Sequence, residues 1–300
     1  MARKRNTAKD TLKDNSKSSG PQPIAGSYEG DYSLIELQPD FYTTDGWLIS
    51  VNGVPSSHIV LGEPQALVFE YMRWIATGTR AFTDEYLDAE KLRITHLGGG
   101  ACTMARYFAD VYPQSRNTVV ELDGELARLA REWFDIPRAP RVKIRVDDAR
   151  VVAESFTPAS RDIIIRDAFA GAVTPENLTT VEFFEHCHRG LAPGGLYISN
   201  CGDHSDLRGA KSELAGMMEV FKHVAVISDP TMLKGRRYGN IILIGSDQEL
   251  FDAHSTQTAA MTRELLGGGV PAQYKDEAWT RRFASGAHPR RDAITDTTVE

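Results

Sequence analysis

The sequence has few cysteines, no long apolar run and no excess of basic residues. Its three cysteines, Cys102, Cys187 and Cys201, are widely spaced, which argues against a disulfide framework or a zinc site. His186 and His188 flank Cys187, but neighbouring helical positions point in different directions, so we expect no metal there. No apolar stretch approaches the roughly 20 residues of a membrane-spanning helix, and the basic N-terminus lacks the apolar core of a signal peptide. These absences predict a cytoplasmic protein with reduced thiols and no membrane partner.

The charge balance is mildly acidic. The 300 residues carry 34 Lys and Arg against 41 Asp and Glu, a formal net charge of −7 at pH 7. This balance disfavours nucleic acid as a partner, because phosphate binding depends on clustered basic side chains. It is compatible with a cationic small substrate, although acidity that only keeps the protein in solution is the simpler interpretation. With 41% apolar and 25% charged residues, the composition predicts a folded globular chain.

Four segments follow one another along the chain. Residues 1–27 are polar and poor in large apolar groups, which predicts a flexible tail. Residues 28–63 alternate short apolar runs with turn pairs such as Asn-Gly, which predicts a small N-terminal antiparallel β domain. Residues 64–247 alternate strand and helix patterns and form the expected cofactor-binding catalytic domain. Residues 248–300 predict a helical extension that ends in a tail.

The third segment predicts a Rossmann-like sheet of about seven strands. Apolar strands alternate with amphipathic helices, which is typical of a doubly wound, mainly parallel α/β fold. A first helix is expected over 64–77, where apolar residues recur at helical spacing after Pro64. The last two strands are separated only by a loop, so we expect an antiparallel hairpin at one edge of the sheet. The expected strands are 93–97, 117–121, 142–146, 162–167, 195–200, 223–228 and 240–245.

A glycine loop is the strongest local signal. In ITHLGGGACTMARYF, a short apolar strand runs into Gly98, Gly99 and Gly100 and then into a helix. Glycine lets the backbone turn sharply and lie close to a ligand, while a helix start offers unpaired N–H groups. Such a loop alone is weak evidence, so the residues at the following strand ends decide what it indicates.

Acidic residues end the next two expected strands. Glu121, followed by Leu122, ends the second strand, and in nucleotide-binding α/β folds an acid there accepts hydrogen bonds from both ribose hydroxyls. The third strand leads into Asp147, Asp148 and Ala149. This position is suited to holding an adenine amino group, and Asp148 is the better candidate by spacing.

The fourth strand ends in Asp167, at the carboxyl edge where ligands bind in this architecture. Any one of these acids is as often a solvated turn residue or a helix cap. Three consecutive acidic strand ends after a glycine loop, however, predict a site for an adenosyl ligand.

The ordered set of motifs resembles the spermidine synthase family, the polyamine aminopropyltransferases, whose fold is that of class I methyltransferases. The resemblance runs from about residue 47 to residue 247 and includes GGGACTMAR, VELD, VDDARVV, DIIIRDAF and LAPGGLYISN. It implies a transferase that is a homodimer and uses decarboxylated S-adenosylmethionine, or S-adenosylmethionine itself, with an amine acceptor. Residue by residue, it implies Gly98, Gly99 and Gly100 as the glycine loop, Glu121 as the ribose acid, Asp148 as the adenine contact and Asp167 as the catalytic aspartate.

The implied reaction is a displacement. A primary amine attacks the aminopropyl carbon beside the sulfonium and releases methylthioadenosine, while Asp167 takes the proton of the amine. Ala101 and Ala170 stand where family members usually carry aspartates, and the basic run 234–237 would repel a polyamine if it faced the pocket. Ala101 also predicts weak discrimination between the two donors, because the N–H groups of the glycine loop would be open to the carboxylate of S-adenosylmethionine. A methyltransferase that uses S-adenosylmethionine and a non-catalytic protein that binds an adenosyl ligand remain the alternatives.

Overall fold

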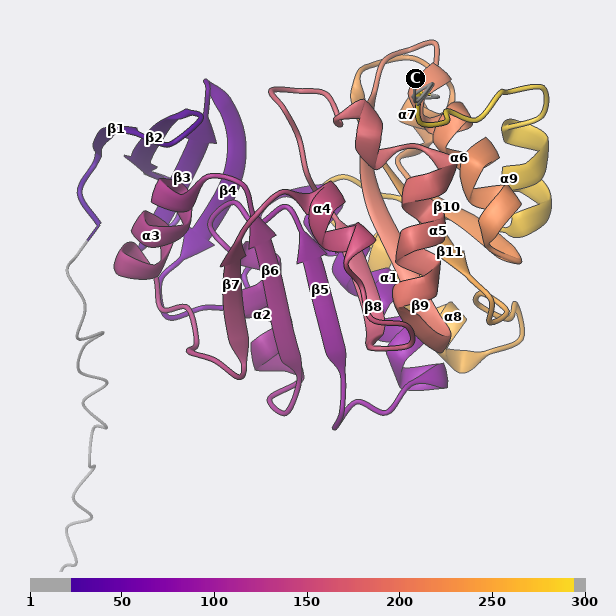
Figure 1. The fold of residues 1–300 in the computed structure, drawn as a ribbon, viewed down its shortest axis with the longest axis horizontal. Coiled ribbons are helices and arrows are strands. Elements are labelled where there is room, and N and C mark those ends of the chain that lie inside the picture. The colour runs from indigo at the N-terminus through magenta and orange to yellow at the C-terminus, as the bar shows by residue number, and fades with distance from the viewer. Residues whose placement is uncertain (1–22, 294–300) are drawn as a thin grey trace, which may run out of the picture.

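The computed structural model describes residues 23–293, which form two sheets and the helices that cover them (Figure 1). Most of the predicted tail, residues 1–27, lies outside the described residues. Within the described part, none of the helices is both long and apolar enough to cross a membrane.

The smaller sheet is built from the first four strands, in the order in which they occur in the sequence. Each pair is antiparallel, and Asn52 and Gly53 form the turn of the last hairpin with φ values of 51° and 76°, as a two-residue hairpin turn requires. Apolar side chains such as Ile35 and Ile49 on one face are fully buried in a cluster with residues that follow the glycine loop. The strands are β1 (Gly26–Glu29), β2 (Leu34–Pro39), β3 (Gly46–Val51) and β4 (Val54–Val60).

The larger sheet contains all seven predicted strands, each within a few residues of the expected bounds. They are β5 (Arg93–Leu97), β6 (Arg116–Glu121), β7 (Val142–Val146), β8 (Arg161–Arg166), β9 (Leu191–Asp203), β10 (His223–Ser228) and β11 (Gly239–Ser246). The order is β12-β10-β11-β9-β8-β5-β6-β7, where β12 (Gln273–Lys275) is an eighth strand. The strands β5 to β9 pair in parallel, whereas β10, β11 and β12 are antiparallel.

Helices cover both faces of the larger sheet, so the predicted doubly wound α/β fold is confirmed. One apolar cluster includes Ile163 and Ile165, and a second includes Ile164 on the other face of the same strand. A strand buried on both faces reads as a continuous apolar run. The helices are α1 (Glu70–Tyr86), α2 (Thr103–Val111), α3 (Gly124–Trp133), α4 (Ala149–Glu154), α5 (Val181–Gly190), α6 (Arg208–Val220), α7 (Pro230–Leu233), α8 (Thr256–Leu266) and α9 (Glu277–Phe283), with a 3₁₀ turn η1 (Glu176–Leu178).

The structure corrects two expectations about the edge of the sheet and the first helix. The hairpin of β10 and β11 is antiparallel as predicted, but β12 pairs with β10 and takes the edge position. A three-residue strand has too few positions to show an alternating pattern. The helix predicted over 64–77 begins at Glu70 instead, because the chain around Pro64 closes a turn in which the Ala66 N–H bonds to the Glu63 carbonyl oxygen.

Candidate active site

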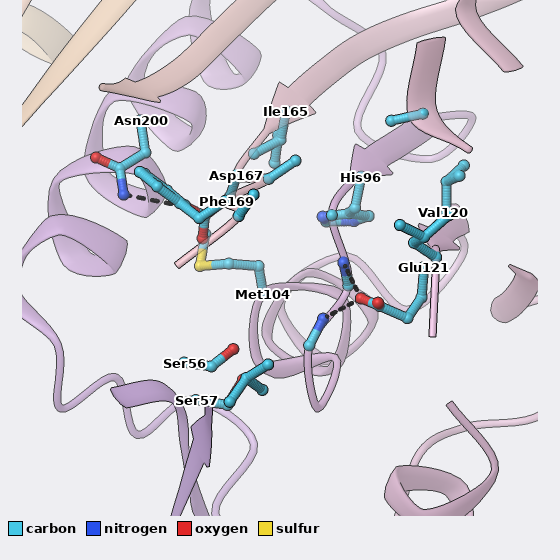
Figure 2. Close-up of a pocket in the computed structure, with 18 of the residues that line it drawn as sticks. Ser56, Ser57, His96, Met104, Val120, Glu121, Ile165, Asp167, Phe169 and Asn200 are labelled. Carbon is cyan, nitrogen blue, oxygen red and sulfur yellow. Dashed lines mark hydrogen bonds between the residues drawn. The ribbon is translucent and has the colours of Figure 1, made fainter. Parts of the chain in front are cut away.

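A cavity of about 370 Å³ opens at the carboxyl ends of the parallel strands. Its wall contains all nine residues singled out from the sequence, although their roles stay predictions. These are Gly98, Gly99, Gly100, Glu121, Leu122, Asp147, Asp148, Ala149 and Asp167. Part of the wall comes from the smaller sheet, through Ser56 and Ser57 of β4 (Figure 2).

The glycine loop is held against its neighbours on three sides. Gly98 and Gly100 have φ values of 93° and 49°, which favour glycine. A Cβ on Gly98 would lie 2.3 Å from the Asp167 carbonyl oxygen, and one on Gly100 would lie 2.7 Å from the Ser57 hydroxyl oxygen. The three glycines therefore allow β5, β8 and the smaller sheet to meet at one point.

The N–H groups of this loop are already bonded within the chain. The Gly98 N–H bonds to the Val120 carbonyl oxygen, and the Ala101 N–H donates to the Ser57 hydroxyl at 3.0 Å. The next two glycines donate to a carboxylate, as described below. The expectation that the loop offers free N–H groups to a ligand carboxylate is therefore wrong, because the smaller sheet and a strand-end acid occupy them.

Glu121 is that strand-end acid. Its Oε2 accepts the N–H groups of Gly99 and Gly100 at 3.0 and 2.8 Å, and its Oε1 accepts the Asp123 N–H at 3.0 Å. Burial raises the pKa of Glu121, and the three N–H groups oppose that shift. A carboxylate has about four acceptor positions, so at least one remains for a ligand hydroxyl.

Asp147 and Asp148 lie where β7 ends, and each has a structural partner. Asp148 caps α4, because its Oδ1 accepts the N–H groups of Arg150 and Val151 at 2.7 and 3.0 Å. Asp147 pairs with Arg145 at 2.6 Å. Among the described residues no donor bonds to Oδ2 of Asp148, so capping leaves that oxygen free to accept from an amino group.

Asp167 lies at the end of β8 and is held by two side chains. Tyr71 of α1 donates its hydroxyl to Oδ2 at 3.1 Å, and Asn200 of β9 donates its amide N–H to Oδ1 at 3.0 Å (Figure 2). Burial raises the pKa of Asp167, while these two donors hold it down. The sequence analysis missed both partners; Asn200 ends a predicted strand, which is the signal that could have found it.

The two alanines and the basic run lie differently with respect to the cavity. Ala101 is fully buried among apolar side chains beneath the smaller sheet and is not part of the cavity wall, whereas Ala170 belongs to it. None of residues 234–237 lines the cavity, and Arg237 pairs with Asp229 at 2.8 Å. Because this basic run does not face the cavity, we no longer expect it to repel a polyamine there.

The cavity wall is acidic, and one of its acids, Asp147, is paired with Arg145 outside the wall. Four carboxylates line it, those of Glu121, Asp147, Asp148 and Asp167, and no lysine or arginine among the described residues does so. A surface of one sign around a small cavity attracts ligands of the opposite charge. The cavity is therefore suited to a cationic ligand.

The doubly wound α/β fold is of the methyltransferase-like class. The structure of human methyltransferase-like protein 13 in complex with SAH has a similar fold, with a TM-score of 0.53 at 20% identity, covering 77% of this chain and 98% of that one. No protein-family model matches the sequence.

Relatives of higher identity narrow the class to a family. The structure of a "probable spermidine synthase" from Corynebacterium glutamicum ATCC 13032 is 81% identical, covers 93% of this chain and 100% of that one, and has a TM-score of 0.90. The chain therefore belongs to the spermidine synthase family. The polyamine aminopropyltransferase of Vibrio vulnificus is 31% identical over 120 residues, which are 39% of this chain. The chain spans only 40% of the length of that curated relative.

Proposed function

We propose that the protein transfers an aminopropyl group from decarboxylated S-adenosylmethionine to an amine. The observation that carries the proposal is a cavity that four carboxylates and no basic side chain of the described residues line, with Asp167 and Glu121 on opposite sides of His96 in Figure 2. A sulfonium donor and an ammonium acceptor are both cations, and an acidic wall stabilises both.

In this proposal two of the described residues bind the donor and a third takes a proton from the acceptor. Glu121 accepts from the ribose hydroxyls and Asp148 accepts from the adenine amino group through its free Oδ2. Asp167 accepts a proton from the acceptor ammonium, whose nitrogen then attacks the carbon next to the sulfonium. The C–S bond breaks, its electron pair returns to sulfur, and neutral methylthioadenosine leaves. The raised pKa of Asp167 suits a base that must take a proton near neutral pH.

Donor recognition favours this reaction over methyl transfer. S-adenosylmethionine carries a carboxylate that needs hydrogen-bond donors or a cation, and a buried anion without them is costly. The N–H groups of the glycine loop are engaged, and no lysine or arginine within residues 23–293 lines the cavity. A donor that has lost its carboxylate avoids this penalty.

The residues around Asp167, where the acceptor amine would bind, favour an amine with a single ammonium near the reacting carbon. Asp167 is the carboxylate there, and the wall around it continues with Phe169, Ala170, Ala172 and Tyr238. A second ammonium on a diamine has no carboxylate to pair with at Ala170. We infer that amines with an uncharged remainder are used at least as well as diamines.

Two further expectations belong to the proposal. Large apolar side chains are exposed on and beside β2, where Phe41 is 91% and Tyr42 is 100% exposed, and such a patch favours a protein interface; we place the homodimer contact there.

The three cysteines are buried free thiols, which suits the reducing cytoplasm.

The test is product formation with a panel of amines. The protein is incubated with decarboxylated S-adenosylmethionine and with butylamine, putrescine, cadaverine or spermidine, and methylthioadenosine is quantified by chromatography. Release with at least one amine supports the proposal, and Ala170→Asp should raise the rate with putrescine relative to butylamine. Release with no amine, or transfer of a methyl group from S-adenosylmethionine instead, would contradict it.

A further inference from the structure

His96 is a polar side chain in the cavity that the proposed reaction leaves without a role. It is the last residue but one of β5, two residues before Gly98, and is only 3% exposed. It nevertheless contributes to the cavity wall. In the view of Figure 2 it lies between Asp167 and Glu121, the two acids that mark the acceptor end and the ribose end.

The hydrogen bonds of Asn117 fix the tautomer of His96. The amide nitrogen of Asn117 donates to the Ser115 hydroxyl at 2.9 Å and to the Arg141 carbonyl oxygen at 3.2 Å. Its Oδ1 is therefore an acceptor, and it lies 3.0 Å from Nε2 of His96, so Nε2 must carry the proton.

The other ring nitrogen is left as an acceptor. Burial lowers the pKa of His96 to about 4, so the ring is neutral at pH 7 and Nδ1 holds a lone pair. The two nitrogens of an imidazole point to opposite sides of the ring, and Nε2 faces Asn117 on β6. No donor among the described residues bonds to Nδ1.

Apart from Asp167 and Glu121 on either side, apolar side chains line the wall near His96. Met72, Met104 and Ile165 line it with apolar atoms, and Ala101 points into the apolar cluster under the smaller sheet. Two acids near the site do not replace the missing aspartate, since neither Asp123 nor Asp203 lines the cavity. An ammonium that lies between Asp167 and Glu121 can bond to Nδ1 of His96.

We propose that Nδ1 of His96 accepts a hydrogen bond from the primary ammonium of the aminopropyl arm of the donor. This inference rests on the proposed function and names a residue that binds the amine of the donor. An uncharged acceptor satisfies an ammonium but offers nothing to a carboxylate. S-adenosylmethionine carries the same ammonium beside its carboxylate, and that carboxylate finds no lysine or arginine among the described residues of the wall. The bond to His96 therefore holds the amine of either donor, and selection of the decarboxylated donor comes from the carboxylate that S-adenosylmethionine would leave unpaired.

The experiment compares two ligands that differ only in the arm. Calorimetric titrations of the full chain and of His96→Phe use decarboxylated S-adenosylmethionine and methylthioadenosine, which lacks the aminopropyl group. Loss of a hydrogen bond to a charged group should weaken the decarboxylated donor by about tenfold or more, with methylthioadenosine affected less than about threefold. His96→Gln, which keeps one donor and one acceptor, should recover part of the loss. His188→Phe is the matched control, because His188 does not line the cavity, and it should leave both affinities unchanged.

Equal weakening of both ligands by His96→Phe, or of neither, would overturn the inference. The unaltered protein gives an independent answer if the variants do not fold. In ¹⁵N NMR spectra of histidine-labelled protein, the Nδ1 signal of His96 should move on addition of the decarboxylated donor and stay in place with methylthioadenosine; no difference between the ligands would overturn the inference. Absence of methylthioadenosine binding to the wild-type chain would instead contradict the proposed function, so the two failures are distinguishable.

Discussion

Replacing Glu121 with glutamine tests the ribose assignment and the architecture of the glycine loop together. The amide oxygen of glutamine can still accept from Gly99 and Gly100, as Oε2 does at 3.0 and 2.8 Å. Its NH₂ group then faces the Asp123 N–H, which Oε1 accepts at 3.0 Å in the wild type. Two donors would oppose each other, and the acceptor position left for a ribose hydroxyl would be lost as well.

The expected loss of binding affinity follows from the strength of a hydrogen bond to a charged acceptor. Each contributes about 1.5–3 kcal/mol, so Glu121→Gln should weaken methylthioadenosine binding by roughly tenfold to 150-fold. The free energy of unfolding should fall by about 1–2 kcal/mol, because one backbone donor in the loop loses its partner.

The assay separates binding from folding. Calorimetric titration gives the affinity for methylthioadenosine, and urea unfolding gives the stability. The matched control is Glu125→Gln, since Glu125 lies four residues on and, among the described residues, pairs only with the half-exposed Arg128 at 2.7 Å. It should change neither quantity by more than about 0.5 kcal/mol. Unchanged affinity in Glu121→Gln would refute the ribose assignment, and unchanged stability would refute the loop contacts.

Three further predictions concern Asp167, its partner Tyr71 and the buried ion pair of Arg166 with Glu213. Asp167→Asn should lower turnover by roughly 10²- to 10⁴-fold with methylthioadenosine binding retained. At pH 8 the variant should be at least as stable as the wild type, because a folded protein with a buried acid of raised pKa loses stability as that acid ionises with rising pH. A marked loss of stability would show a structural role. Tyr71→Phe removes a donor that holds the pKa of Asp167 down, so the acidic limb of the pH–rate profile should move to higher pH, and a shift to lower pH would contradict this. Glu213→Gln leaves Arg166, which is fully buried and bonded to Glu213 at 2.7 Å, without its counter-charge, and should cost about 3–5 kcal/mol in urea unfolding; a loss below 1 kcal/mol would be inconsistent with that burial.

The fold was accessible from the sequence because its signals are local. A continuous apolar run predicts β8, since both of its faces are covered, and the glycine loop shows where β5 turns into α2. The start of α1 was not accessible, because the periodic pattern extends back over a turn at Pro64 that the helix does not include. The strand β12 has no pattern of its own and exists through its pairing with β10.

The acids of the site were predictable by order along the chain, but their surroundings were not. Strand ends converge in any parallel sheet, which is why Glu121, Asp148 and Asp167 share one cavity. The contact of Tyr71 with Asp167 depends on how α1 packs, and the bond from Ala101 to Ser57 depends on how the smaller sheet closes over the loop. Such contacts join segments up to 96 residues apart, and no local pattern encodes them.

The burial of Ala101 illustrates the difference. Its position after the glycines indicates a ligand contact, yet its side chain is 0% exposed among apolar groups of the smaller sheet. An aspartate at this position would place a charge in that cluster. The alanine is therefore part of the packing between the two sheets rather than of the cavity.

The central claim is that the cavity binds an adenosyl cation without a carboxylate. One measurement tests it most directly: calorimetric titration of the full chain with decarboxylated S-adenosylmethionine, S-adenosylmethionine and methylthioadenosine under one set of conditions. We expect the decarboxylated donor and methylthioadenosine to bind, and S-adenosylmethionine to bind at least about tenfold more weakly than the decarboxylated donor. Binding of none of the three, or tighter binding of S-adenosylmethionine, would contradict the account.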